Sequence, residues 1–240
     1  MKKSEEKTTK QSGTTTVSGM KRRSFVKLLG GGIFIFFHPW SAIDLLAIPV
    51  QERRTLTKDY NAFLHIAQDG IITCYTGKIE MGQGIITSLP LMMADELNVR
   101  LEKIKIVMGD TELCPYDAGT WGSLTTQQFG PFMRAALAEA RGVLLDMASS
   151  QFGVSVNQLE VKDGIITDTR NPKNKVSYAQ LAKGKKLEKY LDVKPPVEEY
   201  TKFTYVGTPF KKVDSYEKVT GKAKFTGDHK LPGMVFARIL

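Results

Sequence analysis

"TGKIEMGQGIITSLPLMMADEL", residues 76–97, places three glycines directly in front of an apolar run with helical spacing. Glycine suits positions where the backbone takes a positive φ or comes close to another group. Gly77, Gly82 and Gly84 therefore indicate one of two structures. They form either a plain tight turn or a loop that approaches a small polar ligand.

The run after the glycines, Ile85 to Leu97, predicts an amphipathic helix because its apolar residues recur at helical spacing. Pro90 lies inside this run, so it either kinks the helix or marks its true first turn. Asp95 and Glu96 are expected to point outward. Glu96 in particular is interpreted as a solvated side chain on an acidic surface.

The rest of the chain alternates between strand and helix patterns. "AFLHIAQDGIITCY", residues 62–75, and "VNQLEVKDGIITD", residues 156–168, each place Asp-Gly between two alternating runs, which is typical of a β-hairpin. Residues 104–110 predict a strand. Residues 132–153 predict a long helix that begins at a proline and ends at a glycine. The order of elements predicts an α+β fold, with a polar loop before the long helix that suits a site.

Composition excludes several classes of function. The chain has 240 residues, 42% of them apolar, which is enough for a sizeable core. Its net charge of +9 is scattered and has no interleaved aromatic residues, which argues against nucleic-acid binding. Cys74 and Cys114 lack the spacing of a zinc or iron-sulfur site, although a disulfide between them stays open. His38, His65 and His229 are too far apart in sequence to suggest a local metal cluster.

The first 50 residues have the layout of a twin-arginine export signal. A polar stretch of 20 residues precedes "RRSFVK", residues 22–27, and then a short apolar run over 28–37. That run is too short to span a bilayer, which takes a helix of about 20 residues. Export by the twin-arginine machinery to the periplasm, or to the periplasmic face of a membrane, is the expectation. The alternative is an amphipathic or disordered N-terminal arm.

The C-terminal third of the sequence divides into two parts. Residues 171–212 are lysine-rich and weakly periodic, and they are interpreted as a connecting region with one short helix ending at Gly184. Residues 213–240 predict fresh β-strands, and the last of these stops in mid-element. The chain is therefore expected to be truncated within a second domain.

Three stretches together carry a family resemblance: "GKIEMGQGIITSLPLMMADEL", "VMGDTELCPYDAGTWGSLTTQ" and "KVTGKAKFTGDHKLPGMVFARIL". From about residue 60 onward the chain resembles the molybdopterin-binding large subunit of the xanthine dehydrogenase and aldehyde oxidase family. The order of segments is similar to the isoquinoline 1-oxidoreductase β-subunit type. The resemblance implies a molybdopterin-binding subdomain over 55–170 and the start of an a/b hammerhead domain over 213–240.

The resemblance also implies where the cofactor lies, which is the molybdopterin dinucleotide, expected in its cytosine form. The residues it assigns to cofactor binding form two loops: Met81, Gly82, Gln83 and Gly84, and then Gly122, Ser123, Leu124 and Thr125. Main-chain N–H groups at these glycines and at helix N-termini suit a pyrophosphate, and the Gln83 amide suits a pterin edge. Trp121, next to the second loop, either narrows a substrate pocket or fills core space.

The activity that the resemblance implies is oxidative hydroxylation of an N-heterocycle or an aldehyde, with water as the source of oxygen. Electrons would leave through iron-sulfur (2Fe-2S) clusters on a small partner protein, because a cluster takes four cysteines and this chain has two. The family's catalytic glutamate, in a Gly-Glu motif, has no counterpart here, so no catalytic residue is assigned and the fragment alone is expected to be inactive. Glu80 is a marginal candidate for orienting a cofactor-contacting group.

Two other readings remain open at the level of sequence. One is an exported, non-catalytic binding protein whose glycine-rich loops hold another nucleotide or anion. The other is an inactive fragment that folds only on a partner.

Overall fold

The computed structural model describes residues 32–37, 62–117, 119–183, 186–188 and 196–239. The chain divides into two units, Met1–Gly30 and Gly31–Leu240, and all described residues belong to the second. Helices and strands are mixed along this unit, which agrees with the predicted α+β class. Within the described residues, no helix has both the length and the apolar character needed to cross a bilayer.

The larger sheet has five strands in the order β4-β3-β2-β1-β8. Strand β2 is antiparallel to both of its neighbours, β1 and β3, whereas β4 runs parallel to β3 and β8 runs parallel to β1. The predicted hairpin is therefore confirmed as β2 and β3, and helix α2 (Ile85–Leu97) supplies the crossover to the parallel strand β4. The strands are β1 (Gly32–Phe37), β2 (Ala62–Ala67), β3 (Ile72–Thr76), β4 (Ile104–Met108) and β8 (Lys186–Glu188).

Strand β1 differs from the sequence prediction for the N-terminal segment. Residues 32–37, "GIFIFF", are the second half of the predicted apolar signal run, yet they pair with β2 and with β8. β-branched and aromatic residues favour a strand wherever a neighbouring edge is available, and β2 provides that edge. The rest of the predicted signal, residues 1–31 and 38–50, lies outside the described residues, so the export signal remains a prediction.

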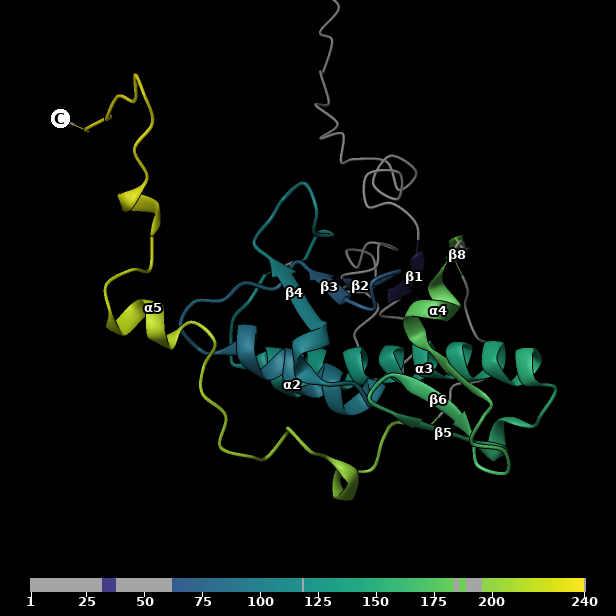
Figure 1. Ribbon diagram of the computed structural model, residues 1–240. Helices are drawn as coiled ribbons and strands as arrows, with labels where there is room; N and C mark the ends of the chain where they lie inside the picture. Colours follow the sequence, from purple (N-terminus) through teal and green to yellow (C-terminus); the bar gives the residue numbers. More distant parts are fainter. Residues whose placement is uncertain (1–31, 38–61, 118, 184–185, 189–195, 240) are drawn as a thin grey trace, which may run out of the picture. The chain divides into compact units, whose positions relative to one another are not determined.

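Two helices lie along one face of the five-stranded sheet (Figure 1). Helix α2 (Ile85–Leu97) has the predicted bounds, and Pro90 is buried in its interior rather than at its first turn. Helix α3 (Gly130–Phe152) has Pro131 at its start and ends at Gly153, whose φ of 68° suits glycine. Leu89 and Met93 of α2 and Leu137 and Leu144 of α3 are fully buried in the shared core.

A second, antiparallel sheet contains β5 (Leu159–Lys162), β6 (Ile165–Asp168) and β7 (Lys175–Ser177). The hairpin predicted around Asp163 and Gly164 is confirmed. Ser177 caps the short helix α4 (Tyr178–Ala182), and the Tyr178 hydroxyl donates a hydrogen bond to the carbonyl of Leu97 at 3.0 Å. Part of the predicted connecting region is therefore folded onto the end of α2.

The segment from residue 196 to 213 runs beside α2 and is held by its C-terminal half. Asp95 accepts hydrogen bonds from three consecutive main-chain N–H groups, those of residues 204–206. Glu96 accepts one from the Glu198 N–H and forms an ion pair with Arg134. The prediction that Asp95 and Glu96 point outward is wrong, because they are 4% and 0% exposed. Helical periodicity predicted the wrong exposure for these two side chains because a segment remote in sequence covers this side of the helix.

The last described residues also differ from prediction. Residues 213–239 contain helix α5 (Ser215–Val219), and no strand is found among residues 196–239. Strands need a partner edge, and the main-chain hydrogen bonds of residues 214–239 are local. The hammerhead assignment therefore remains a prediction.

The remaining short turns are the 3-10 turns Leu101–Lys103, Val156–Gln158, Tyr200–Lys202 and Thr226–Asp228, and one π-helical turn, Thr125–Phe129.

Candidate functional site

The glycine-rich loop, residues 77–84, connects β3 to α2. Gly82 and Gly84 have φ angles of 101° and 92°, values that residues with a Cβ rarely adopt. A Cβ added to Gly82 would meet nothing within 4 Å, so at that position the backbone conformation rather than lack of space calls for glycine. The loop is therefore a tightly wound chain segment placed directly before a helix N-terminus.

A second loop, residues 109–124, is bound to the first by an ion pair and hydrogen bonds. The Lys78 ammonium forms an ion pair with Asp117 at 2.8 Å and donates to the Gly119 carbonyl at 2.9 Å. The Ile79 N–H donates to the Thr120 hydroxyl at 3.0 Å. A Cβ added to Gly77 would lie 2.4 Å from the Asp117 Cβ, so this glycine permits the close approach of the two loops.

Replacing Gly77 with alanine is expected to lower the free energy of unfolding by about 1–3 kcal/mol, the usual cost of overpacking. The new methyl group would also lie 2.6 Å from the Pro115 carbonyl oxygen, so the second loop must shift to make room for it. Urea denaturation measures the change. Gly227→Ala is the matched control, because a Cβ there meets nothing within 4 Å. Equal stability of Gly77→Ala and the parent would contradict the close approach of the loops.

A cavity of about 450 Å³ lies between the two loops. The first loop and α2 contribute Met81, Gln83, Ile85 and Ser88, and the second loop with the π-helical turn contributes Thr120, Trp121, Gly122, Ser123, Thr125 and Thr126. Gln83 and Ser123, on separate loops, thus share one cavity. Of the eight residues that the sequence assigned to cofactor binding, Gly82, Gly84 and Leu124 are not among those that line it.

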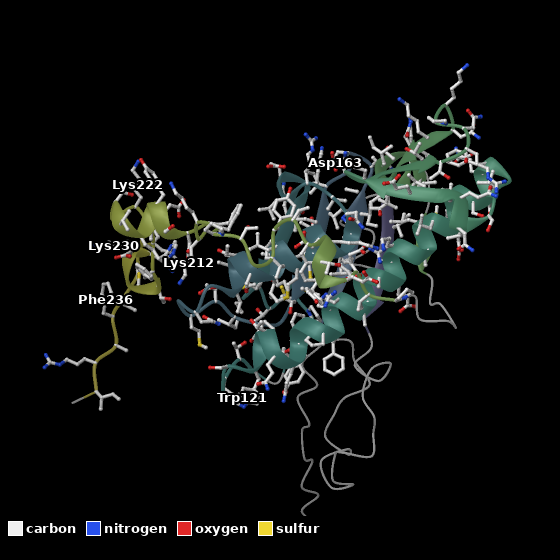
Figure 2. All side chains as sticks on the ribbon, turned by 90° about the horizontal axis from the view of Figure 1, so that it is seen from below. Trp121, Asp163, Lys212, Lys222, Lys230 and Phe236 are labelled. Carbon is white, nitrogen blue, oxygen red and sulfur yellow. The ribbon has the colours of Figure 1, made fainter. Side chains whose placement is uncertain are left out.

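The second loop has its own unusual backbone at the cavity. Gly122 and Ser123 both take positive φ, at 64° and 57°, and the π-helical turn that follows leads into α3. Trp121 is 59% exposed and lines the cavity, and Figure 2 shows it at the start of α3. The interpretation of Trp121 as core filling is therefore wrong. Sequence reasoning missed Ile85, Ser88, Thr120 and Thr126 because only the fold brings them to the cavity.

Three main-chain amides of the first loop, those of Met81, Gly82 and Gly84, are already occupied by side chains of the same loop. Glu80 accepts hydrogen bonds from the N–H groups of Gly82, Gly84 and Ile86 at 2.7, 3.0 and 2.9 Å. Gln83 accepts from the Met81 N–H at 2.5 Å and donates to the Ile79 carbonyl at 2.8 Å. The expectation that Gly82 and Gly84 offer their N–H groups to a pyrophosphate does not hold in this conformation, because the Glu80 carboxylate takes that place.

The two cysteines lie near this region as free thiols, so no disulfide joins them. Burial raises the pKa of the Cys74 thiol to about 12, with a smaller contribution from Cys114, and burial also raises the pKa of Cys114. Both are therefore protonated at neutral pH and poorly suited as metal ligands. No group of three or more His, Cys, Asp or Glu side chains that could hold a metal ion occurs in the described part of the chain.

Comparison with known proteins identifies the family of the chain. Residues 6–227 match the family model described as the molybdopterin cofactor-binding domain. The chain belongs to this family. It is similar to a nicotinate dehydrogenase polypeptide of Pseudomonas putida, with 30% identity over 178 residues, and to the β-subunit of isoquinoline 1-oxidoreductase of Brevundimonas diminuta, with 23% identity over 218 residues. The predicted resemblance to molybdenum hydroxylase large subunits is thereby confirmed.

The chain spans only part of these family members. The alignments cover 74% and 75% of the chain but 15% and 28% of the two relatives, respectively. Among solved structures, the CO dehydrogenase of Oligotropha carboxidovorans matches with a TM-score of 0.46 and 22% identity, over 62% of this chain and 18% of that one. These relatives are named as dehydrogenases and oxidoreductases.

Proposed function

We propose that the cavity between the two loops binds part of a molybdopterin dinucleotide cofactor, in its cytosine form, as one section of a molybdenum hydroxylase large subunit. One observation carries the proposal. Gln83 and Ser123 come from loops that are far apart in the sequence, and both line the same cavity. At about 450 Å³ this cavity is within the usual size range of small-molecule sites.

The residues around the cavity fit the chemistry of a pterin. A glutamine amide has two donor and two acceptor positions, and the loop uses one of each, so Gln83 keeps one donor and one acceptor for a ligand. Ser88, Thr120 and Thr126 add hydroxyl groups, and the exposed ring of Trp121 offers a flat apolar surface.

Phosphate groups are proposed to lie at the second loop rather than the first. The first loop's amides at Gly82 and Gly84 are taken by Glu80. The second loop has two consecutive residues with positive φ, Gly122 and Ser123, and leads into the π-helical turn Thr125–Phe129, which continues as α3, so the partial positive charge of the helical N-terminus lies at this turn. The sequence had assigned phosphate contacts to both loops, and this proposal keeps only those of the second.

The proposed reaction is oxidative hydroxylation of an N-heterocycle or an aldehyde. The bound molybdenum cofactor would supply the redox chemistry, and this chain's contribution would be to bind and orient it. The relatives named for nicotinate and isoquinoline favour an N-heterocycle as substrate. No residue of this chain is assigned a catalytic role.

Electron transfer and export are proposed on sequence grounds. With two cysteines in 240 residues the chain cannot ligate an iron-sulfur cluster that takes four, so the clusters would lie on a small iron-sulfur partner. The Arg22–Arg23 pair and the apolar run behind it support export by the twin-arginine machinery to the periplasm.

Blocking the cavity tests the proposed function. The parent chain, produced in a host that makes the cofactor, is expected to retain molybdopterin, measured as pterin fluorescence after oxidative release and as molybdenum by elemental analysis. Ser88→Phe places a ring in the cavity and is expected to lower retention at least about tenfold, which corresponds to about 1.4 kcal/mol.

Ser150→Phe is the matched control, because Ser150 is exposed on α3 and does not line the cavity. Loss of pterin in Ser88→Phe with normal retention in Ser150→Phe would support the assignment. A parent chain without pterin or molybdenum would favour the non-catalytic binding module. Equal retention in both variants would place the cofactor elsewhere.

A further inference from the structure

Glu80 stabilises the first loop, residues 77–84, by accepting hydrogen bonds from main-chain N–H groups of the same loop. It is half-buried and does not line the cavity. One carboxylate oxygen accepts from the Gly82 and Gly84 N–H groups, and the other accepts from the Ile86 N–H in the first turn of α2. Two amides of the first loop and one of α2 therefore converge on a single carboxylate that belongs to the chain itself.

This arrangement also caps α2. The N-cap residue of the helix is Gly84, which has no side chain to satisfy the free N–H groups of the first turn. Glu80 supplies the acceptor instead, and a negative charge at a helix N-terminus is favourable. The positive φ angles of Gly82 and Gly84 bend the backbone so that these amides turn toward Glu80.

We propose that Glu80 is the positioning residue that sets the conformation of loop Met81–Gly84 before any cofactor binds. The Gln83 amide is hydrogen-bonded within this loop, to Met81 and Ile79, so its place at the cavity depends on the shape of the loop. The cofactor part of this inference rests on the proposed function. The effect of Glu80 on the loop does not.

The charges around Glu80 are compatible with an ionised carboxylate. Burial opposes its charge, but hydrogen bonds from the N–H groups of Ile86, Gly84 and Gly82 outweigh burial, so the pKa of Glu80 lies below its ordinary value. Asp214 acts in the opposite direction, and the Lys218 ammonium of α5 lies close enough to interact favourably. Lys212 donates to the Gly82 carbonyl at 3.1 Å and adds a further positive charge beside the loop.

The lowered pKa determines how the loop responds to pH. A carboxyl group whose folded pKa is depressed stabilises the structure above its unfolded pKa, and this contribution is lost as the pH falls through the folded pKa. The loop is therefore expected to be fully ordered at neutral pH. It should loosen only on acidification below the ordinary range of a glutamate.

Amide hydrogen exchange, followed by NMR at Gly82, Gly84 and Ile86, tests the effect on the loop. In Glu80→Ala these three amides are expected to exchange at least about tenfold faster than in the parent at pH 7, while buried amides of α3 keep their protection as a check on folding. Glu80→Gln retains one oxygen but presents an NH2 group in place of the other, so an intermediate effect is expected.

Glu112→Ala is the matched control, because Glu112 is exposed on the second loop and its side chain makes none of these hydrogen bonds. In the parent, protection corrected for intrinsic rates should fall with acidification, whereas in Glu80→Gln it should not depend on pH. Parent-like exchange at all three amides in Glu80→Ala would overturn the proposal.

Pterin retention in the same variants tests the link to the cofactor. Glu80→Ala is expected to retain several-fold less pterin than the parent, with partial rescue in Glu80→Gln. If the parent itself retains none, the proposed function fails while the exchange data still decide the role of Glu80 in the loop. If Glu80→Ala exchanges faster but retains as much pterin as the parent, the positioning role toward the cofactor is wrong.

Discussion

Replacing Glu96 with alanine is expected to lower the free energy of unfolding by about 3–5 kcal/mol, the usual cost of removing one partner from a buried ion pair. Glu96 is fully buried, and one of its oxygens accepts from Arg134 Nε at 3.0 Å. The other accepts from the Glu198 N–H at 2.8 Å and lies 3.5 Å from the Arg141 guanidinium. Without this carboxylate, the Glu198 N–H loses its acceptor, and Arg134 loses its ion-pair partner while its bond to the Glu198 carbonyl remains.

Urea denaturation of the 240-residue chain measures this effect. Glu102→Ala is the control, because Glu102 is exposed in the turn after α2, and its loss is expected to change stability by no more than about 0.5 kcal/mol. A loss below about 1 kcal/mol for Glu96→Ala would mean that Arg141 and Glu198, which pair at 2.6 Å, keep the network intact without Glu96.

Replacing Asp95 with alanine is expected to lower the free energy of unfolding by about 3 kcal/mol. The same change is expected to release the segment that follows residue 203. The Asp95 carboxylate accepts from the Thr204 N–H at 2.8 Å, the Thr204 hydroxyl at 2.9 Å, the Tyr205 N–H at 3.0 Å and the Val206 N–H at 2.7 Å. Hydrogen bonds to a charged acceptor contribute about 1.5–3 kcal/mol each, and bonds that share one acceptor do not add in full.

Two measurements separate this effect from general destabilisation. Urea denaturation gives the change in stability, and limited trypsin digestion under native conditions should cut faster at Lys202 and Lys211, which flank the segment that Asp95 holds. Asp146→Ala on the exposed side of α3 is the control and should alter neither. Unchanged digestion at these lysines in Asp95→Ala would show that other contacts, such as the Val213 N–H to the Thr87 hydroxyl, hold the segment.

These two carboxylates also affect the first loop, residues 77–84. The segment that they hold continues to Lys212, which donates to the Gly82 carbonyl of the loop, and to Val213, whose N–H donates to the Thr87 hydroxyl of α2. Figure 2 shows Lys212 in the part of the chain that leads to α5. The residues after 213 therefore begin beside the first loop, at the point where the predicted second domain begins.

Local sequence patterns were sufficient to predict most of the helices and strands. Helix α2 has the predicted bounds because its apolar spacing is matched by real burial, as at Leu89 and Met93. Helix α3 begins near Pro131 and ends at Gly153 because both residues act through their own backbone, whatever surrounds them. The two Asp-Gly hairpins form for the same local reason.

Prediction failed where a side chain's partner is remote in sequence. Asp95 and Glu96 look solvent-exposed by helical periodicity, but they bind a segment about a hundred residues later in the chain. Residues 32–37 look like part of an export signal, yet β2 offers them an edge. Residues 213–239 carry strand-like patterns, but without a partner edge they form a short helix and turns.

The sequence alone determined the family, through its motifs, and the first glycine-rich loop, because positive φ at Gly82 and Gly84 and close approach at Gly77 both depend on residue type. Only the tertiary structure decided that Glu80 already occupies the amides of the first loop and that Trp121 lies at the cavity. It also showed that the loops meet through Lys78 and Asp117. The physical reason is that hydrogen bonds and ion pairs depend on distances in space, which the spacing of residues along a chain does not specify.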